Sequence, residues 1–158
     1  MKFLVDGIMK RFVHIVVMFL LAVPAQAKVT DYTVRVLQKY SHDSKAYTQG
    51  LFFHNGTMYE TTGLKGQSSV RIVDYKTGKV IRKTEMPAYC FGEGSCVVDG
   101  KLFVLTWQNS IAFEYDPVSL DCKRKMAYQR EGWGLTAIPE NERSWYSGAV
   151  MVASDGSS

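Results

Sequence analysis

Histidine and cysteine are scarce in this chain of 158 residues, which contains three of each. Outside the N-terminal segment only His42 and His54 remain, and two histidines are too few for a histidine-ligated catalytic metal. The cysteines Cys90, Cys96 and Cys122 lack the spacing of a zinc site, and their odd number allows at most one disulfide within a monomer. We therefore expect neither a metal centre nor another cofactor.

The chain also lacks a strong excess of charge of one sign. Its 19 lysines and arginines face 15 acidic residues, which gives a formal net charge of +4 with both signs interspersed. A nucleic-acid surface needs a denser basic patch, so nucleic acid is excluded as a partner. No linker rich in proline or serine interrupts the sequence after its N-terminal segment. Residues 28–158 are accordingly expected to form one domain.

A long apolar run occurs only near the N-terminus, at residues 12–23. It follows Lys10 and Arg11 and precedes the A-x-A cleavage motif at 25–27, the pattern of a signal peptide. A transmembrane helix is the weaker interpretation, because a bilayer span needs about 20 apolar residues. The sequence thus predicts a signal peptide at 1–27 and a secreted or periplasmic protein with no membrane segment.

Helical periodicity is missing from the rest of the chain, where short β-rich runs alternate with turn residues. Pairs such as Asn55-Gly56 and Asp99-Gly100 are typical of tight turns between antiparallel strands. The expected strands are residues 50–53, 57–61, 69–74, 80–84, 95–98, 101–106, 111–115 and 122–127. The pattern predicts an all-β fold of successive hairpins.

Internal repetition identifies the architecture more closely. The stretch YTQGLFF at 47–53 aligns with FGEGSCV at 91–97, and a third copy opens with GWGL at 132–135. A period of roughly 40 to 45 residues with about four strands per unit is typical of the β-propeller blade. We therefore expect blades of four-stranded antiparallel sheet, with about two and a half to three blades in this chain.

One position of the repeat differs in chemistry between units. Gln49, Glu93 and Trp133 occupy it in successive units, and each precedes a glycine. Equivalent positions of propeller blades lie at equivalent radius and height around the central axis. An amide, a carboxylate and an indole that converge in this way indicate a ligand pocket rather than a purely architectural repeat.

Glu93 is the candidate for proton transfer in that pocket. Gly92 and Gly94 on either side allow close approach of a ligand to the backbone or a positive φ. Phe91 and Tyr89 can supply apolar surroundings that raise the pKa of a carboxyl group. The alternative is an ordinary solvated glutamate in a polar turn.

Two tryptophans are candidates for the wall of the pocket. Trp107 corresponds to Gly63 of the preceding unit, and it can either face the site or pack between blades. Trp133 lies between two glycines, which favours a position at the site over core packing.

Five motifs in fixed order, YTQGLFF, YETTGLKGQSSVR, FGEG, KLFVLTW and EGWGLT, resemble the glutamine cyclotransferase family, the plant and bacterial glutaminyl-peptide cyclotransferases. The resemblance covers residues 40–136 and resumes weakly at 154–158. It implies a five-bladed propeller without metal that acts as an aminoacyltransferase (EC 2.3.2 type). Such an enzyme converts N-terminal glutamine of a peptide or protein to pyroglutamate and releases ammonia, and it is expected to be a monomer at full length.

The resemblance also implies roles for individual residues. Glu93 matches the catalytic acid and base, Gln49 and Tyr47 match substrate-binding positions, and Phe91, Trp107 and Trp133 match an aromatic wall.

The sequence departs from the family pattern at 138–148, which is longer than the matching part of the preceding unit. Because the family needs further blades, we expect this chain to be an inactive fragment of an enzyme. Two alternatives remain open: a non-catalytic propeller that binds a peptide or glycan at its hub, and a fragment with no function of its own.

Overall fold

The structure is a computed structural model that describes residues 30–143, 148 and 150–156. The expected signal peptide at 1–27 lies outside these residues. The chain divides into two compact parts, Met1–Leu37 and Gln38–Ser158. In the first part the described residues, 30–37, are exposed and have no regular secondary structure. Within the described ranges there is no helix long and apolar enough to cross a membrane.

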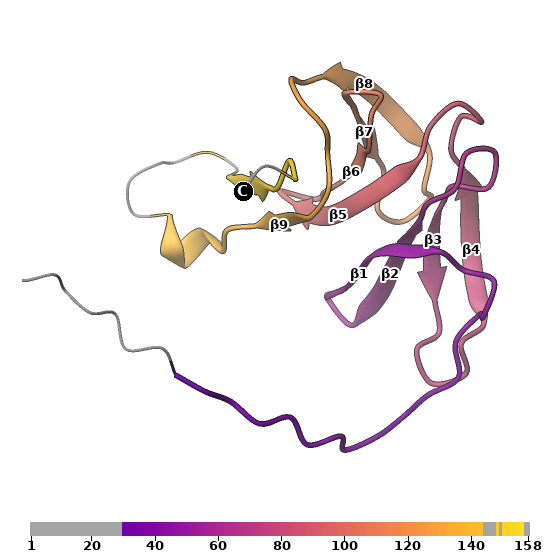
Figure 1. The fold of residues 1–158 in the computed structure, drawn as a ribbon, viewed down its shortest axis with the longest axis vertical. Coiled ribbons are helices and arrows are strands. Elements are labelled where there is room, and N and C mark those ends of the chain that lie inside the picture. Colours follow the sequence, from indigo (N-terminus) through magenta and orange to yellow (C-terminus); the bar gives the residue numbers. More distant parts are fainter. Residues whose placement is uncertain (1–29, 144–147, 149, 157–158) are drawn as a thin grey trace, which may run out of the picture. The chain divides into compact units, whose positions relative to one another are not determined.

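The part Gln38–Ser158 begins with a four-stranded antiparallel sheet in the order β1-β2-β3-β4, which corresponds to the first repeat unit (Figure 1). The strands are β1 (Thr48–His54), β2 (Thr57–Thr62), β3 (Ser69–Val73) and β4 (Val80–Glu85). Asn55 and Gly56 join β1 to β2 with φ of 49° and 76°. A two-residue hairpin of this type requires positive φ at both positions, which asparagine and glycine tolerate.

The second sheet repeats the first in strand order and antiparallel direction (Figure 1). Its strands are β5 (Gly92–Val98), β6 (Lys101–Thr106), β7 (Ile111–Tyr115) and β8 (Cys122–Ala127). Asp99 and Gly100 form the first turn with φ of 49° and 70°. The repeat extends to irregularities, because β1 and β5 both have a register shift near their starts and β3 and β7 both have one near their ends.

A third unit contributes two paired strands, β9 (Leu135–Ala137) and β10 (Met151–Ala153). Between them the 3-10 helix η1 (Glu140–Glu142) lies in the segment 138–148 that the sequence marks as longer than its counterpart. Residues 144–147 and 149 of this connection are outside the described part of the chain.

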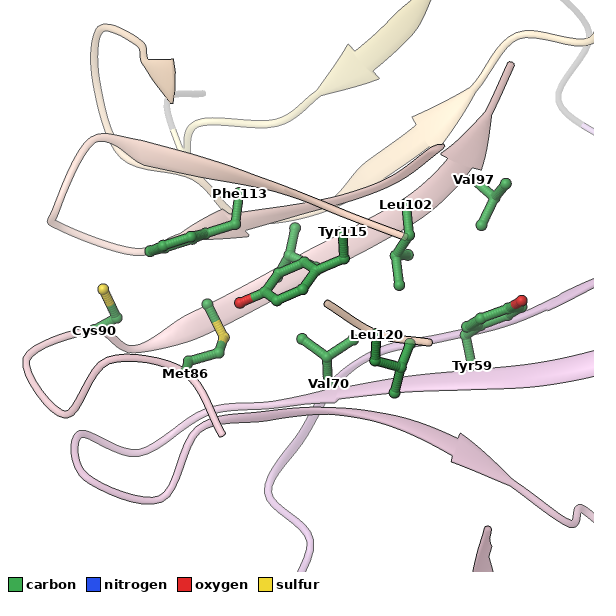
Figure 2. Packing of buried hydrophobic residues seen from close by; sticks show 10 residues of the cluster. Tyr59, Val70, Met86, Cys90, Val97, Leu102, Phe113, Tyr115 and Leu120 are labelled. Carbon is green, nitrogen blue, oxygen red and sulfur yellow. The ribbon is translucent and has the colours of Figure 1, made fainter. Parts of the chain in front are cut away.

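Buried side chains from both four-stranded sheets and their connections form one core (Figure 2). Phe113 and Leu102 of the second sheet and Val70 of the first are fully buried. Truncation of a buried phenylalanine to alanine typically costs about 3 to 5 kcal/mol, so this cluster is a principal source of stability. The Tyr59 hydroxyl also donates a 3.0 Å hydrogen bond to the Pro117 carbonyl, which ties the first sheet to the β7–β8 turn.

The outer strands of both sheets are largely exposed and basic. β4 contains Arg82 and Lys83, and β8 contains Lys123, Arg124 and Lys125. Charged side chains on an edge strand discourage pairing with other chains. The inner strand β5, by contrast, is buried along its whole length.

The expected all-β class and four-stranded antiparallel sheets are confirmed. The eight expected strands all form, and the main difference is that β1 and β5 begin two and three residues earlier than expected, at Thr48 and Gly92. Gln49 and Glu93 therefore lie inside strands. The number of blades in the whole protein and the closure of a propeller stay predictions.

Candidate active site

Glu93 lies in an irregular part of β5, where the register with β6 shifts between Gly92 and Ser95. A bulge of this kind redirects a side chain relative to the regular alternation of a strand. The backbone around the bulge is held by two neighbours. Thr61 of β2 donates a 2.7 Å hydrogen bond from its hydroxyl to the Glu93 carbonyl, and the Gly94 amide donates one of 2.7 Å to the Trp133 carbonyl.

The glycines beside Glu93 are required for close packing within the protein. A Cβ added at Gly94 would lie 2.5 Å from the Leu135 amide nitrogen, and one at Gly92 would lie 2.7 Å from the Thr62 carbonyl oxygen. Neither glycine has a left-handed φ. The expectation that they serve approach of a ligand or a positive φ was wrong, because neighbouring backbone occupies the space.

The same requirement recurs one unit earlier and explains the repeated glycine. A Cβ at Gly50 would lie 2.7 Å from Ser95 Oγ, so β1 packs closely beside β5 as β5 packs beside the start of β9. Gln49 occupies the equivalent bulge of β1 and is half-buried. The structure thus places Gln49 on the strand adjacent to that of Glu93, but shows no hydrogen bond between their side chains.

Burial changes the acidity of Glu93, whose exposed fraction is only 7%. Loss of hydration raises the pKa of this carboxyl group to about 7, and the negative charge of Glu131 adds to the increase. At neutral pH both protonation states are therefore populated, as an exchange of protons with a substrate requires. The alternative of an ordinary solvated glutamate in a polar turn does not fit this burial.

Four of the six candidate residues form a continuous row of aromatic rings. The ring centroids are 6.0 Å apart for Tyr47 and Phe91, 5.6 Å for Phe91 and Trp107, and 6.5 Å for Trp107 and Trp133. All three pairs meet edge to face, the geometry that the aromatic quadrupole favours. Tyr47 and Trp133 at the two ends are 53% and 43% exposed, so the row is accessible from solvent.

The glycine that corresponds to Trp107 in the first unit makes this row possible. A Cβ at Gly63 would lie 2.5 Å from Cζ of Phe91, so any side chain at position 63 would displace the ring. The absence of a side chain at Gly63 in the first repeat thus leaves the space that the ring of Phe91, from the second repeat, fills.

Glu131 is a site residue that the sequence analysis missed. Its Oε2 accepts hydrogen bonds from Nε1 of Trp107 at 2.8 Å and from Nε1 of Trp133 at 3.2 Å. The position directly before the GWG motif was the available signal. Its contact with Trp107, 24 positions away, depends on the path of the β8–β9 connection, which local sequence does not specify.

The described residues offer no metal-binding arrangement. No group of three or more histidine, cysteine or acidic side chains is placed to hold a metal ion among them. Cys90 and Cys96 are buried and Cys122 is exposed, and all three are free thiols. His42 instead forms a 2.8 Å hydrogen bond with the buried Glu60.

The described part of the chain thus combines repeated four-stranded antiparallel sheets with a buried carboxyl group and an accessible row of aromatic rings. Comparisons with known proteins identify the family that shares this sequence and fold. The family model described as glutamine cyclotransferase matches residues 12–158. The chain is 37% identical over 127 residues to a glutaminyl-peptide cyclotransferase of Arabidopsis thaliana, an alignment that covers 79% of this chain and 37% of the plant protein. The chain belongs to the glutamine cyclotransferase family.

The similarity extends to a solved structure. The crystal structure of glutaminyl cyclase from Myxococcus xanthus matches with a TM-score of 0.64 and 28% identity, over 77% of this chain and 47% of the bacterial one. The chain therefore spans less than half the length of both relatives.

Proposed function

We propose that this chain forms part of a glutaminyl-peptide cyclotransferase, an aminoacyltransferase that converts N-terminal glutamine of peptides or proteins to pyroglutamate. Family membership and the names of both relatives support this assignment. The observation that carries it is the carboxyl group of Glu93, which is buried and has a pKa raised to about 7 beside an accessible row of aromatic rings. The alternative of a propeller that only binds peptide or glycan has no comparable support.

In the proposed reaction Glu93 moves one proton. The α-amine of the substrate attacks the δ-carbon of its own side-chain amide, and the Glu93 carboxylate accepts a proton from that nitrogen. The protonated Glu93 then donates the same proton to the amide nitrogen that departs. The bond between the δ-carbon and this nitrogen breaks, ammonia leaves, and the five-membered lactam remains. Because both reacting groups belong to one molecule, correct orientation supplies much of the rate.

A carboxyl group with an ordinary pKa would perform the second half of this cycle poorly, because it would rarely hold a proton at neutral pH. General acid and base catalysis is most efficient when the pKa lies near the working pH. Burial of Glu93 provides that match here. No metal or external nucleophile is required by this scheme.

The remaining candidate residues are assigned to substrate binding. Phe91, Trp107 and Trp133 form the wall against which the glutamine side chain folds, and Tyr47 extends it. Gln49, on the adjacent strand, is assigned to the substrate amide. Truncation of Trp133 to alanine should therefore raise KM and lower kcat together.

The architecture of the whole protein is also a proposal. We expect a closed propeller of five blades that acts as a monomer. The 158-residue chain alone is expected to lack turnover and to associate, since it spans less than half of its relatives and β10 is an exposed strand.

We further propose export by cleavage after Ala27. A secreted or periplasmic product that retained residues before Lys28 in mass spectrometry would contradict this.

The test of the function is release of ammonia and pyroglutamate from a dipeptide that begins with glutamine. The assay compares the 158-residue chain with a chain extended to the length of its relatives. An N-acetylated dipeptide is the control, because its blocked nitrogen cannot attack. We expect turnover of the free dipeptide by the extended chain only. Binding of the dipeptide without turnover by the extended chain would overturn the proposal in favour of a binding propeller.

A further inference from the structure

The Glu131 carboxylate lies where the two tryptophan side chains of the aromatic row converge. Both indole nitrogens donate to the same atom, Oε2, at 2.8 Å from Trp107 and 3.2 Å from Trp133. We propose that Glu131 is a positioning residue that fixes the orientation of these two indoles at the candidate site. The geometric part stands on these contacts alone, whereas its importance for catalysis rests on the proposed function.

Two donors that share one acceptor constrain the angle between their rings. An indole has a single N–H donor, so its direction fixes the rotation of the ring plane about the side chain. With both N–H groups aimed at one oxygen, the rings lie at 81° with centroids 6.5 Å apart. Trp107 follows β6 and Trp133 precedes β9, so Glu131 joins side chains from two successive units.

Backbone contacts hold Glu131 in place. The following residue, Gly132, donates hydrogen bonds to the carbonyls of Thr106 at 3.2 Å and Trp107 at 3.1 Å. A Cβ at Gly132 would lie 2.8 Å from the Thr106 carbonyl oxygen, so this close approach requires glycine. The Tyr128 hydroxyl donates to that same carbonyl at 2.5 Å, which fixes the other side of the connection. Hydrogen bonds to backbone carbonyls on either side thus hold the segment that carries this carboxylate.

The donors to this carboxylate are all neutral. Gln108 Nε2 approaches its Oε1 at 3.4 Å, and in the described part of the chain no lysine or arginine forms an ion pair with Glu131. The adjacent Arg130 pairs with Asp155 at 2.7 Å instead. The negative charge of Glu131 acts on Glu93, whose pKa it helps to raise. Tyr128 is also close enough for Glu93 to raise its pKa.

Two substitutions separate the hydrogen bonds from the charge. Glu131→Gln keeps a side-chain oxygen that can accept from both indoles but removes the charge. Glu131→Ala removes both. If Glu131 positions the rings, the glutamine variant should keep the indole geometry and the alanine variant should lose it. A residue that merely supported the fold would give no such division.

The experiment measures the indole N–H resonances by nitrogen-15 NMR in the chain extended to the length of its relatives, with Trp107→Phe and Trp133→Phe for assignment. We expect both resonances to shift and to exchange faster with water in Glu131→Ala, and to stay close to wild type in Glu131→Gln. Glu140→Gln, which alters an exposed carboxylate on η1, should change neither. Indole resonances unchanged in Glu131→Ala would overturn the proposal.

A second readout follows the carboxyl carbon of Glu93 during a pH titration. We expect its pKa to fall in Glu131→Gln, because a nearby like charge that raises it has been removed. If Glu131→Ala fails to fold, Glu131→Gln still decides: lost indole hydrogen bonds together with an unchanged Glu93 titration would refute the assignment. Neither readout needs turnover, so failure of the proposed enzymatic function would be recognised separately.

Discussion

The hydroxyl of Thr61 donates a 2.7 Å hydrogen bond to the backbone carbonyl of Glu93. The same hydroxyl lies 3.1 Å from Ser95 Oγ, and Thr61 is fully buried. A residue of the first four-stranded sheet therefore fixes the backbone on which the candidate proton carrier of the second sheet is mounted. The site is shared between successive units and does not belong to either sheet alone.

Thr61→Val should destabilise the fold by about 1 to 3 kcal/mol, because it leaves the buried Glu93 carbonyl without its donor while nearly conserving volume. Denaturant unfolding of the two proteins measures this difference. Thr136→Val, at an exposed position of β9, is the matched control and should change stability by less than about 0.5 kcal/mol. Equal effects of the two substitutions would show that the Thr61 contact has no special role.

Gly94→Ala should be destabilising by about 1 to 3 kcal/mol, because its Cβ would meet the backbone of the β8–β9 connection and of β9. The comparison is Gly134→Ala, whose Cβ would lie 3.2 Å from the side-chain oxygen of Ser154 and would meet no backbone atom within 4 Å. In thermal unfolding, the midpoint temperature of Gly94→Ala should be clearly lower than that of Gly134→Ala. Similar midpoints would mean that β5 and β9 do not pack as closely as described.

Much of the fold could be predicted from local patterns. Turn pairs such as Asn55-Gly56 predict hairpins. The repeat of about 44 residues between Gln49 and Glu93 predicts two sheets with the same number and order of strands. The repeat also placed Glu93 just before the expected strand 95–98, whereas in the structure β5 already begins at Gly92. These features depend on residues close in sequence or on self-similarity, both of which are visible without coordinates.

Other features of the site depend on contacts between distant segments. Glu131 meets Trp107 only because the β8–β9 connection passes beside the end of β6. The need for glycine at position 94 arises from the path of that connection, so a role in ligand approach was inferred instead. No pattern along the chain encodes the direction of a carboxylate toward two indoles from different units.

Burial of Glu93 should make the stability of the fold depend on pH. The folded pKa of about 7 lies above the ordinary value of 4.5, so between these values the unfolded chain releases a proton that the folded chain retains. The contribution of Glu93 to the free energy of unfolding is therefore fully present below pH 4.5 and is lost as the pH rises through about 7. Among the described residues, Glu131 and Tyr128 interact electrostatically with Glu93.

Glu93→Gln should remove this dependence, because glutamine stays neutral. Relative to wild type, the variant should gain on the order of 1 to 3 kcal/mol of stability at pH 8 and little at pH 4. Urea unfolding of the chain extended to the length of its relatives, at several pH values, measures the difference. A constant difference between pH 4 and pH 8 would contradict the raised pKa.

The most direct test of the account is the kcat of Glu93→Gln in a chain extended to the length of its relatives. Glutamine preserves shape and hydrogen bonding but cannot carry a proton, so kcat should fall by about 10² to 10⁴ while KM stays nearly constant. Glu142→Gln, an exposed change on η1, should leave kcat unaltered. Retention of more than about a tenth of the wild-type kcat by Glu93→Gln would contradict its role as the proton carrier.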